Sequence, residues 1–252
     1  MKDFKIRCSQ IGQIMGNMGL TQNQEITLLE LSKKDKLTER QKQTLIDLTH
    51  KKNNPEIPQT IKSYVDRWLK EQVYGRREFI ETKAMRKGIL CEDRAIEYAG
   101  GLFGWKAIKN AKEFNDEYMT GTPDVILPDA IVDLKCPWSC FTFPLYEKEP
   151  DKGYWWQLQG YMNLTGKENA FLIYTLMDLP DDMLDQELHY AKYRFDVLEL
   201  SDNQRDQVIG ELTYENLPDE LRIKVFEIER DQEAIDSVKK RVEEIREYIK
   251  SL

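Results

Sequence analysis

The 252-residue sequence lacks long apolar segments, which excludes the class of proteins that cross a membrane as helices. The apolar run Phe171–Tyr174 is far shorter than the about 20 residues that a spanning helix needs. The polar start MKDFKIRCSQ has no apolar signal-peptide core. With 40% hydrophobic and 33% charged residues, the chain is expected to be a cytosolic globular protein that buries a sizeable core.

Histidine and paired cysteine are also scarce. His50 and His189 lie in unrelated contexts, which argues against histidine-rich metal sites and against Ser-His-Asp hydrolysis. No Cys-x-x-Cys pair occurs among the four cysteines, so neither a zinc ribbon nor a disulfide framework is indicated. Chemistry in this chain would therefore use carboxylates and lysine.

The net charge of −8 is unevenly distributed along the chain. Residues 1–90 contain 18 Lys and Arg against 11 Asp and Glu, whereas residues 91–252 contain 19 against 34. A basic first part could hold phosphates while acidic residues elsewhere hold a metal ion. An ordinary solvated helix surface is the alternative interpretation of the same charges.

Helical periodicity and strand-like alternation are both present. Helices are expected within 4–20, at 38–50, 58–74 and 81–99, and over GYWWQLQGYMNLTG up to Gly166, with a break at KKNNPEIP. Strands are expected at 112–119, 123–127, 130–135, 170–176 and 189–198. This order favours an α/β or α+β fold with a mixed sheet flanked by helices.

The C-terminal stretch repeats in heptads, with one row of apolar positions at Ile228, Ile235, Val242 and Ile249 and another at Val238, Ile245 and Leu252. A helix that packs on its own domain and a seam to another subunit both explain this repeat. Its short length favours intramolecular packing.

Glu92 is an acidic residue within the apolar stripe of the expected helix 81–99. A carboxylate that points toward a core needs a partner, because burying an unpaired charge is costly. A metal ion would satisfy this carboxylate, and so would a neighbouring Arg or Lys.

The segment GTPDVILPDAIVDLKCPW holds a second set of charged residues. The period of two in a strand places Asp133 and Lys135 on one face, and a hairpin would bring Asp124 beside Asp133. Two converging carboxylates repel unless a cation or proton lies between them, and oxygen ligands suit Mg²⁺ or Mn²⁺. A neighbouring lysine could orient the attacking water. An Asp–Lys pair on a surface hairpin is the alternative.

Five motifs occur in an order that resembles a nuclease family: IRCSQIGQIMG, CEDRAIEYAGG, MTGTPDVIL, DLKCPWS and YWWQLQGYMNLTGKENAFLIY. Together they resemble the PD-(D/E)XK nuclease superfamily and, within it, the phage lambda exonuclease-like (YqaJ-type) alkaline exonucleases. The resemblance implies one nuclease domain with a restriction-endonuclease-like core. We expect a helical N-terminal part at about 1–80, a catalytic core at about 81–200 and a C-terminal helical segment at about 201–252.

The resemblance also implies a centre for two Mg²⁺ ions, in which Mn²⁺ can substitute. Asp124 and Asp133 would be metal ligands, with the main-chain carbonyl of Leu134 completing the shell. Glu92 would bind a second metal or its water. Asp133 stands where the family often has glutamate.

Further roles follow from the same resemblance. Lys135 would position the nucleophile, and Gln157 would contact Lys135 or the scissile phosphate. Ser9, helped by Arg7 or Lys2, would be a candidate clamp for a terminal 5′-phosphate. A basic surface would follow the DNA backbone without reading bases, through Arg76, Arg77, Lys83, Arg86 and Lys87. Three tryptophans could stack on bases or belong to the core: Trp138, Trp155 and Trp156.

The activity implied is metal-dependent digestion of linear double-stranded DNA from a 5′ end, which yields single strands for phage-type recombination. Implied partners are DNA ends, a single-strand annealing protein and copies of the chain in a ring trimer, in the host cytoplasm if the chain is phage-encoded. A structure-specific endonuclease of the same fold and a non-catalytic DNA-end-binding module are alternatives. A RecB-like nuclease with an iron–sulfur cluster is disfavoured, because no cysteine follows Cys140.

Overall fold

A four-stranded mixed sheet lies at the centre of the computed structural model, which describes residues 3–16, 18–54, 57–106 and 108–252. The strand order is β4-β5-β6-β7, in which β5 and β6 are parallel and the other neighbours are antiparallel. The strands are β4 (Val125–Ile126), β5 (Ala130–Lys135), β6 (Asn169–Thr175) and β7 (Ile223–Glu229). The inner strands β5 and β6 are nearly continuous apolar runs because both of their faces are buried.

Helices cover both faces of this sheet. On one face, Val132 and Leu134 pack with Cys91 of α5 (Lys83–Phe103). On the other, Ile131 packs in a cluster with Leu158 of α6 (Lys152–Thr165), which also includes residues of α9 (Gln232–Lys250). The expected mixed sheet flanked by helices is confirmed, and it places α5 and α6 on opposite sides of β5.

Local capping fixes where the two site-bearing helices begin and end. Thr82 accepts a hydrogen bond from the Met85 N–H at the start of α5, and Asp151 accepts from the N–H groups of Gly153 and Tyr154 at the start of α6. Such caps satisfy N–H groups that have no partner within the helix. Both helices end at a glycine in the left-handed conformation, Gly104 and Gly166.

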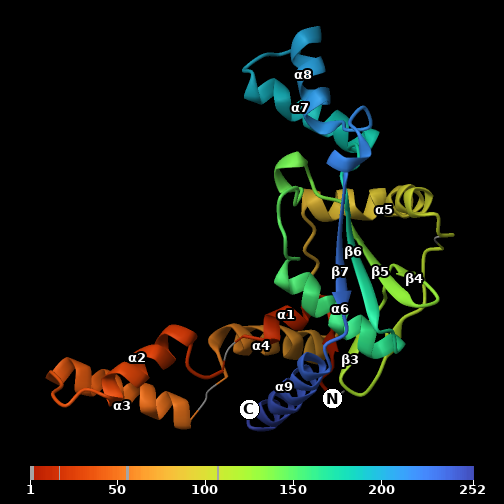
Figure 1. Ribbon diagram of the computed structural model, residues 1–252. Helices are drawn as coiled ribbons and strands as arrows, with labels where there is room; N and C mark the ends of the chain where they lie inside the picture. The colour runs from red at the N-terminus through yellow and green to blue at the C-terminus, as the bar shows by residue number, and fades with distance from the viewer. Residues whose placement is uncertain (1–2, 17, 55–56, 107) are drawn as a thin grey trace.

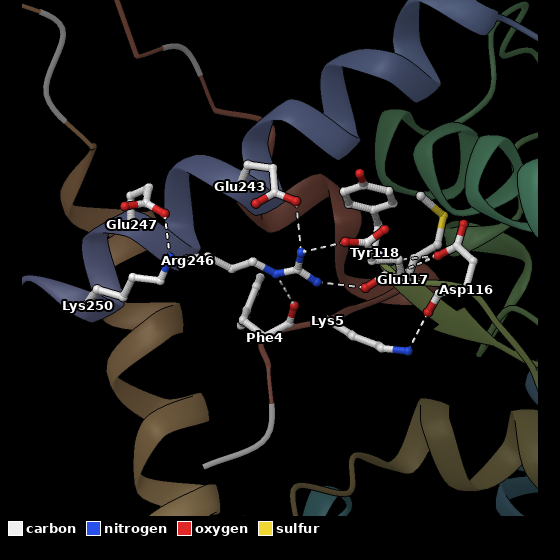
Figure 2. A network of polar contacts seen from close by, with 10 residues as sticks. Phe4, Lys5, Asp116, Glu117, Tyr118, Glu243, Arg246, Glu247 and Lys250 are labelled. Atoms are coloured by element: carbon white, nitrogen blue, oxygen red, sulfur yellow. Dashed lines mark hydrogen bonds and ion pairs between the residues drawn. The ribbon is translucent and has the colours of Figure 1, made fainter.

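A second, three-stranded sheet joins the N-terminal segment to the core. Its order is β1-β3-β2, with β1 (Ile6–Arg7), β2 (Phe114–Asn115) and β3 (Met119–Gly121). The 3₁₀ turn Cys8–Gln10 and α1 (Ile11–Ile14) follow β1. Figure 2 shows how Arg246 of α9 secures this region, because it donates to the carbonyls of Phe4 and Glu117 at 3.1 and 2.7 Å.

The C-terminal heptads pack inside the molecule. Ile235, Val238, Val242 and Ile245 of α9 are at most 1% exposed. The preference for intramolecular packing is therefore confirmed over these positions. The repeat does not extend along the whole segment, because Ile228 lies in β7 and Leu252 is exposed.

Two helical hairpins project from the body of the molecule (Figure 1). One consists of α2 (Gln22–Ser32) and α3 (Glu39–Asn53), and each of these helices begins at a threonine capping box. The other consists of α7 (Asp181–Arg194) and α8 (Asp202–Leu212), inserted between β6 and β7. The hairpin of α2 and α3 leads into α4 (Gln59–Tyr74), which packs on the core.

Three sequence expectations need correction. The expected strand 189–198 is the end of α7 and the turn after it. In α7 the buried residues Met183, Leu188 and Ala191 share one helical face, and acidic residues at its start and basic residues at its end complement the helix dipole. The expected strand 112–119 is interrupted because Asp116 accepts hydrogen bonds from the N–H groups of Tyr118 and Met119 in a turn. The segment 201–252, expected to be helical, contains the edge strand β7.

Candidate active site

A β-hairpin brings the two aspartates of the predicted site together. In the antiparallel pair of β4 and β5, Val125 is opposite Val132 and Ile126 is opposite Ile131. The same register places Asp124 opposite Asp133. Oδ2 of Asp124 accepts a hydrogen bond from the Leu134 N–H at 2.7 Å, which fixes the side chain across the hairpin.

Asp133 is buried with only 1% of its surface exposed. Its Oδ1 accepts a hydrogen bond from Nε2 of Gln157 at 3.0 Å. Its Oδ2 lies 2.7 Å from Nζ of Lys135 but receives no hydrogen bond of acceptable geometry from the described residues. The ammonium therefore compensates this carboxylate oxygen, which can still bind a metal ion through its other lone pair.

Lys135 extends from the same face of β5 and is largely enclosed. Its Nζ lies 4.5 Å from the centre of the Tyr154 ring, a cation–π contact that limits where the ammonium can go. Burial opposes the charged form of this amine, but Asp133 and then Asp124 outweigh the effect, and the pKa of Lys135 is raised. The side chain is therefore a cation beside the carboxylate pair, suited to contact a phosphate or hold a water.

Asp124 carries the electrostatic cost of the pair. Burial, followed by repulsion from Asp133, raises the pKa of Asp124 from 3.8 to about 7, although Lys135 opposes this shift. A carboxylate with such a pKa is poorly compensated as an anion. A divalent cation at this position would remove the cost.

Glu92 of α5 faces the same cavity from the other side. It lines a cavity of about 690 Å³ together with Asp124, Asp133, Lys135 and Gln157. Its carboxylate lies 3.3 Å from Nζ of Lys109. A neighbouring lysine, one of the partners expected for Glu92, thus pairs with this carboxylate.

The donor set fits a Mg²⁺ centre with few protein ligands. Within the described ranges, no three carboxylate, thiol or imidazole side chains gather as a cage for a metal ion. Two carboxylates, a main-chain carbonyl and water are sufficient for Mg²⁺, which retains several waters in most protein sites. Asp124 and Asp133 would hold such an ion, and Glu92 lies outside this pair.

Gln157 is placed differently from the expectation. Its Nε2 donates to Asp133 and to the hydroxyl of Tyr161 at 2.9 Å, so it contacts the partner of Lys135 rather than Lys135 itself. The predicted contact with the scissile phosphate stays a prediction. Gln159, on the same helix, instead joins α6 to the connection between β7 and α9 through the Glu229 carbonyl and the Asp231 N–H.

The predicted DNA contacts are partly on the surface. Arg76 and Arg77 are exposed in the connection before α5, and Arg86 is partly exposed and paired with Asp182 at 2.7 Å. Lys87, by contrast, is fully buried, donates to the Trp138 carbonyl and faces the Tyr214 ring. Its predicted contact with the DNA backbone is wrong because its ammonium does not reach the surface.

The N-terminal candidates lie near the small sheet. Ser9 is exposed, and Arg7 is partly exposed and paired with Glu71 at 3.2 Å, while Lys2 lies outside the described residues. Among the tryptophans, Trp138 lines the active-site cavity, whereas Trp155 and Trp156 pack edge to face against each other and are partly buried against the core.

Three functional candidates were missed by sequence reasoning. Tyr154 covers Lys135, Tyr161 supports Gln157, and Lys109 holds Glu92. Helical spacing could have found the two tyrosines, because residues three before and four after Gln157 share its face of the helix. Nothing in the sequence pairs Lys109 with Glu92.

Comparisons with known proteins agree with this architecture. No family model and no curated protein matches the sequence. A crystal structure of a phage-related exonuclease from Haemophilus somnus 129PT is 25% identical, with a TM-score of 0.69 over 98% of this chain and 94% of that one. An alkaline exonuclease from Laribacter hongkongensis is 15% identical, with a TM-score of 0.58 over 98% of this chain and 92% of that one.

A crystal structure of the same Laribacter hongkongensis enzyme, LHK-Exo, in complex with dAMP is also similar, at 16% identity and a TM-score of 0.55. In the part of this chain that the structure describes, no helix is long and apolar enough to cross a membrane. The similarity extends over nearly the whole chain. The chain therefore shares the fold of the phage-related and alkaline exonucleases, and its predicted resemblance to the lambda exonuclease-like, YqaJ-type nucleases is confirmed.

Proposed function

We propose that this protein is a metal-dependent exodeoxyribonuclease that digests linear double-stranded DNA from a 5′ end. The observation that carries the proposal is the constellation at the β4–β5 hairpin. Asp124 and Asp133 oppose each other, and Nζ of Lys135 lies 2.7 Å from Oδ2 of Asp133. Similarity to a phage-related exonuclease supports the same activity.

The proposed centre uses Mg²⁺, with Mn²⁺ as a substitute. Two divalent cations in such a centre supply an activated water and stabilise the leaving oxygen of a phosphodiester. Asp124 and Asp133 hold the first ion, with the Leu134 carbonyl as a further ligand, and Glu92 serves a second ion.

The remaining residues of the site act on the substrate and on each other. The ammonium of Lys135 lies beside the carboxylate pair, where it stabilises negative charge on the phosphate and orients water. Gln157 fixes the Asp133 carboxylate through Oδ1, which leaves Oδ2 beside the ammonium of Lys135. Tyr154 restricts Lys135 from the other side.

The DNA enters, in this proposal, along the exposed basic residues. Arg76, Arg77 and Arg86 contact the backbone, and Arg7 and Ser9 contact a terminal 5′-phosphate. Phosphate contacts of this kind position a duplex without reading its sequence. A ring trimer and a single-strand annealing protein complete the proposed recombination role, and sedimentation with co-purification tests them.

The decisive experiment uses linear duplex DNA labelled at the 5′ or the 3′ end, with Mg²⁺ or with chelator. If the proposal is right, the 5′ label is released early as mononucleotide when Mg²⁺ is present, and it is not released in chelator. Cleavage of closed circles would instead identify an endonuclease, and early release of the 3′ label would reverse the polarity. Duplex binding without any cleavage would identify a non-catalytic end-binding module.

Three variants assign the activity to this site. Asp133→Ala and Lys135→Ala should each lower cleavage by about 100-fold or more while duplex binding persists. Asp129→Ala, an exposed carboxylate at the turn of the same hairpin, is the matched control and should cleave normally. Unchanged digestion by both site variants would remove the assignment.

A further inference from the structure

We infer that Lys109 is a positioning residue whose ammonium is the internal counter-ion of Glu92. It thereby sets how tightly a second divalent cation binds at the catalytic cavity. This inference rests on the proposed function, because it concerns the metal centre proposed there. Lys109 itself is neither a proposed metal ligand nor a group that contacts the substrate.

The position of Lys109 is fixed by its backbone. Lys109 forms an isolated antiparallel bridge with Val125, the residue after Asp124. The next residue, Asn110, donates from its backbone N–H to the Asp124 carbonyl at 2.7 Å and from its side chain to the Pro123 carbonyl at 2.9 Å. The segment 109–110 is therefore attached to the strand that carries the first metal ligand.

This attachment also determines where the side chain points. Residues that are directly opposite in an antiparallel pair have their side chains on the same face. Val125 is buried on the face that packs with Cys91 of α5, so Lys109 extends toward α5 as well. Its Nζ lies 3.3 Å from Glu92 and 2.9 Å from Asp93.

Of these two carboxylates, only Glu92 faces the catalytic cavity. Glu92 lines that cavity with Asp124 and Asp133, and its side chain is 27% exposed, whereas Asp93 is 81% exposed. The ammonium of Lys109 lies closer to Asp93 than to Glu92, and it pairs with both carboxylates. A cation that binds Glu92 from the cavity must therefore compete with an ammonium that is already present and held by a second acid.

The other carboxylates of the centre are arranged differently. Asp124 contacts a main-chain N–H and has no ammonium within 4 Å among the described residues, whereas Asp133 is paired with Lys135 at 2.7 Å. A cation at the aspartate pair can therefore bind Asp124 without displacing an ammonium, although Lys135 stays paired with Asp133. A cation at Glu92 meets a single carboxylate that Lys109 already pairs. This difference produces one tighter and one weaker metal position.

The test measures Mn²⁺ binding directly, by electron paramagnetic resonance of free Mn²⁺ and by calorimetry, on the full chain without DNA. The wild-type protein should show one tighter and one weaker site. Lys109→Met should strengthen the weaker site by roughly two- to fivefold, the range that corresponds to one partly exposed ion pair, and leave the tighter site unchanged. Lys109→Arg preserves the ion pair and should bind as the wild type does.

Two further variants make the result specific. Lys112→Met removes a positive charge three residues along the same segment, where the ammonium lies over the Phe114 ring instead of a carboxylate, and it should change neither site. Glu92→Gln should abolish the weaker site with either residue at position 109. Cleavage by Lys109→Met should reach half of its maximal rate at a lower Mg²⁺ concentration, in parallel with the binding result.

Several results would overturn the inference while leaving the proposed nuclease intact. These are an unchanged or weakened second site in Lys109→Met, an equal gain in Lys112→Met, or a weaker site that survives Glu92→Gln. A wild-type protein that binds no Mn²⁺ would overturn the proposed metal centre together with the inference. Melting curves followed by circular dichroism show that each variant is folded.

Discussion

Replacing Asp124 by asparagine should stabilise the metal-free protein, even though it removes a proposed metal ligand. The amide keeps an oxygen that accepts the Leu134 N–H, so the hydrogen bond across the hairpin survives. The substitution removes one of two opposed carboxylates and the repulsion between them. The centre is stable with both acids only when a cation lies between them.

The magnitude follows from the pKa of this carboxyl group. Burial and Asp133 raise the pKa of Asp124 from 3.8 to about 7, so the folded protein retains a proton that the unfolded chain has lost between these values. The cost of the ionised group is absent below pH 3.8, grows up to pH 7 and is constant above it. At pH 8.5 it amounts to about 4 kcal/mol, and at pH 5.5 to about 2 kcal/mol.

The assay is thermal unfolding of the wild type and Asp124→Asn in chelator, at pH 5.5 and at pH 8.5. The melting temperature of the variant should exceed that of the wild type at pH 8.5, and the gap should be about 4–8 °C smaller at pH 5.5. Saturating Mg²⁺ should raise the melting temperature of the wild type and hardly change that of the variant, because only the wild type retains the metal site. Asp129→Asn, on the exposed turn, is the control and should show no gap.

Two results would refute this reasoning. A variant that melts at or below the wild-type temperature at pH 8.5 would show that the carboxylate pair carries no cost in the fold. A gap that stays constant between the two pH values would show that Asp124 ionises normally.

Three further substitutions test the supports of the site. Gly160→Ala places a methyl group 2.8 Å from the Cys8 sulfur. Urea titration should show a free energy of unfolding that is lower by about 1–3 kcal/mol. Equal stability would contradict the close packing of α6 on the N-terminal segment. Arg246→Met removes the hydrogen bond to the Phe4 carbonyl and should cost about 2 kcal/mol, with the exposed Lys250→Met as a nearly neutral control. Gln157→Leu should cost about 1–3 kcal/mol and reduce cleavage without loss of duplex binding, because the buried aspartate loses its donor; normal cleavage would deny that Gln157 positions this carboxylate.

The sequence predicts the hairpin that bears the site because its signals are local. The Gly-Thr-Pro segment and the alternation after it place Asp124 beside Asp133, and the structure has them in that register. The same reasoning fails at 189–198, where a short alternating pattern competes with a full helical face. The helical face prevails because Met183, Leu188 and Ala191 can be buried together only in a helix.

Lys87 and Lys109 show two different limits of sequence reasoning. Lys87 precedes Cys91 and Ala95 at helical spacing, and both of these are buried, so its burial was already indicated by the pattern. The contact between Lys109 and Glu92 joins residues 17 positions apart through the packing of a strand edge on a helix. Contacts of this second kind follow from the tertiary fold, as does the contact of Arg246 with Phe4 near the other end of the chain.

The unequal pairing of the three acids gives the centre an order of metal loading. Asp133 has Lys135 within 2.7 Å, Glu92 has Lys109 within 3.3 Å, and Asp124 has a main-chain N–H as its close partner. A cation is therefore stabilised most beside Asp124, where negative charge is least compensated, and least beside Glu92. The first ion should bind at the aspartate pair, and the second should bind at Glu92 when a DNA phosphate adds negative charge to the cavity.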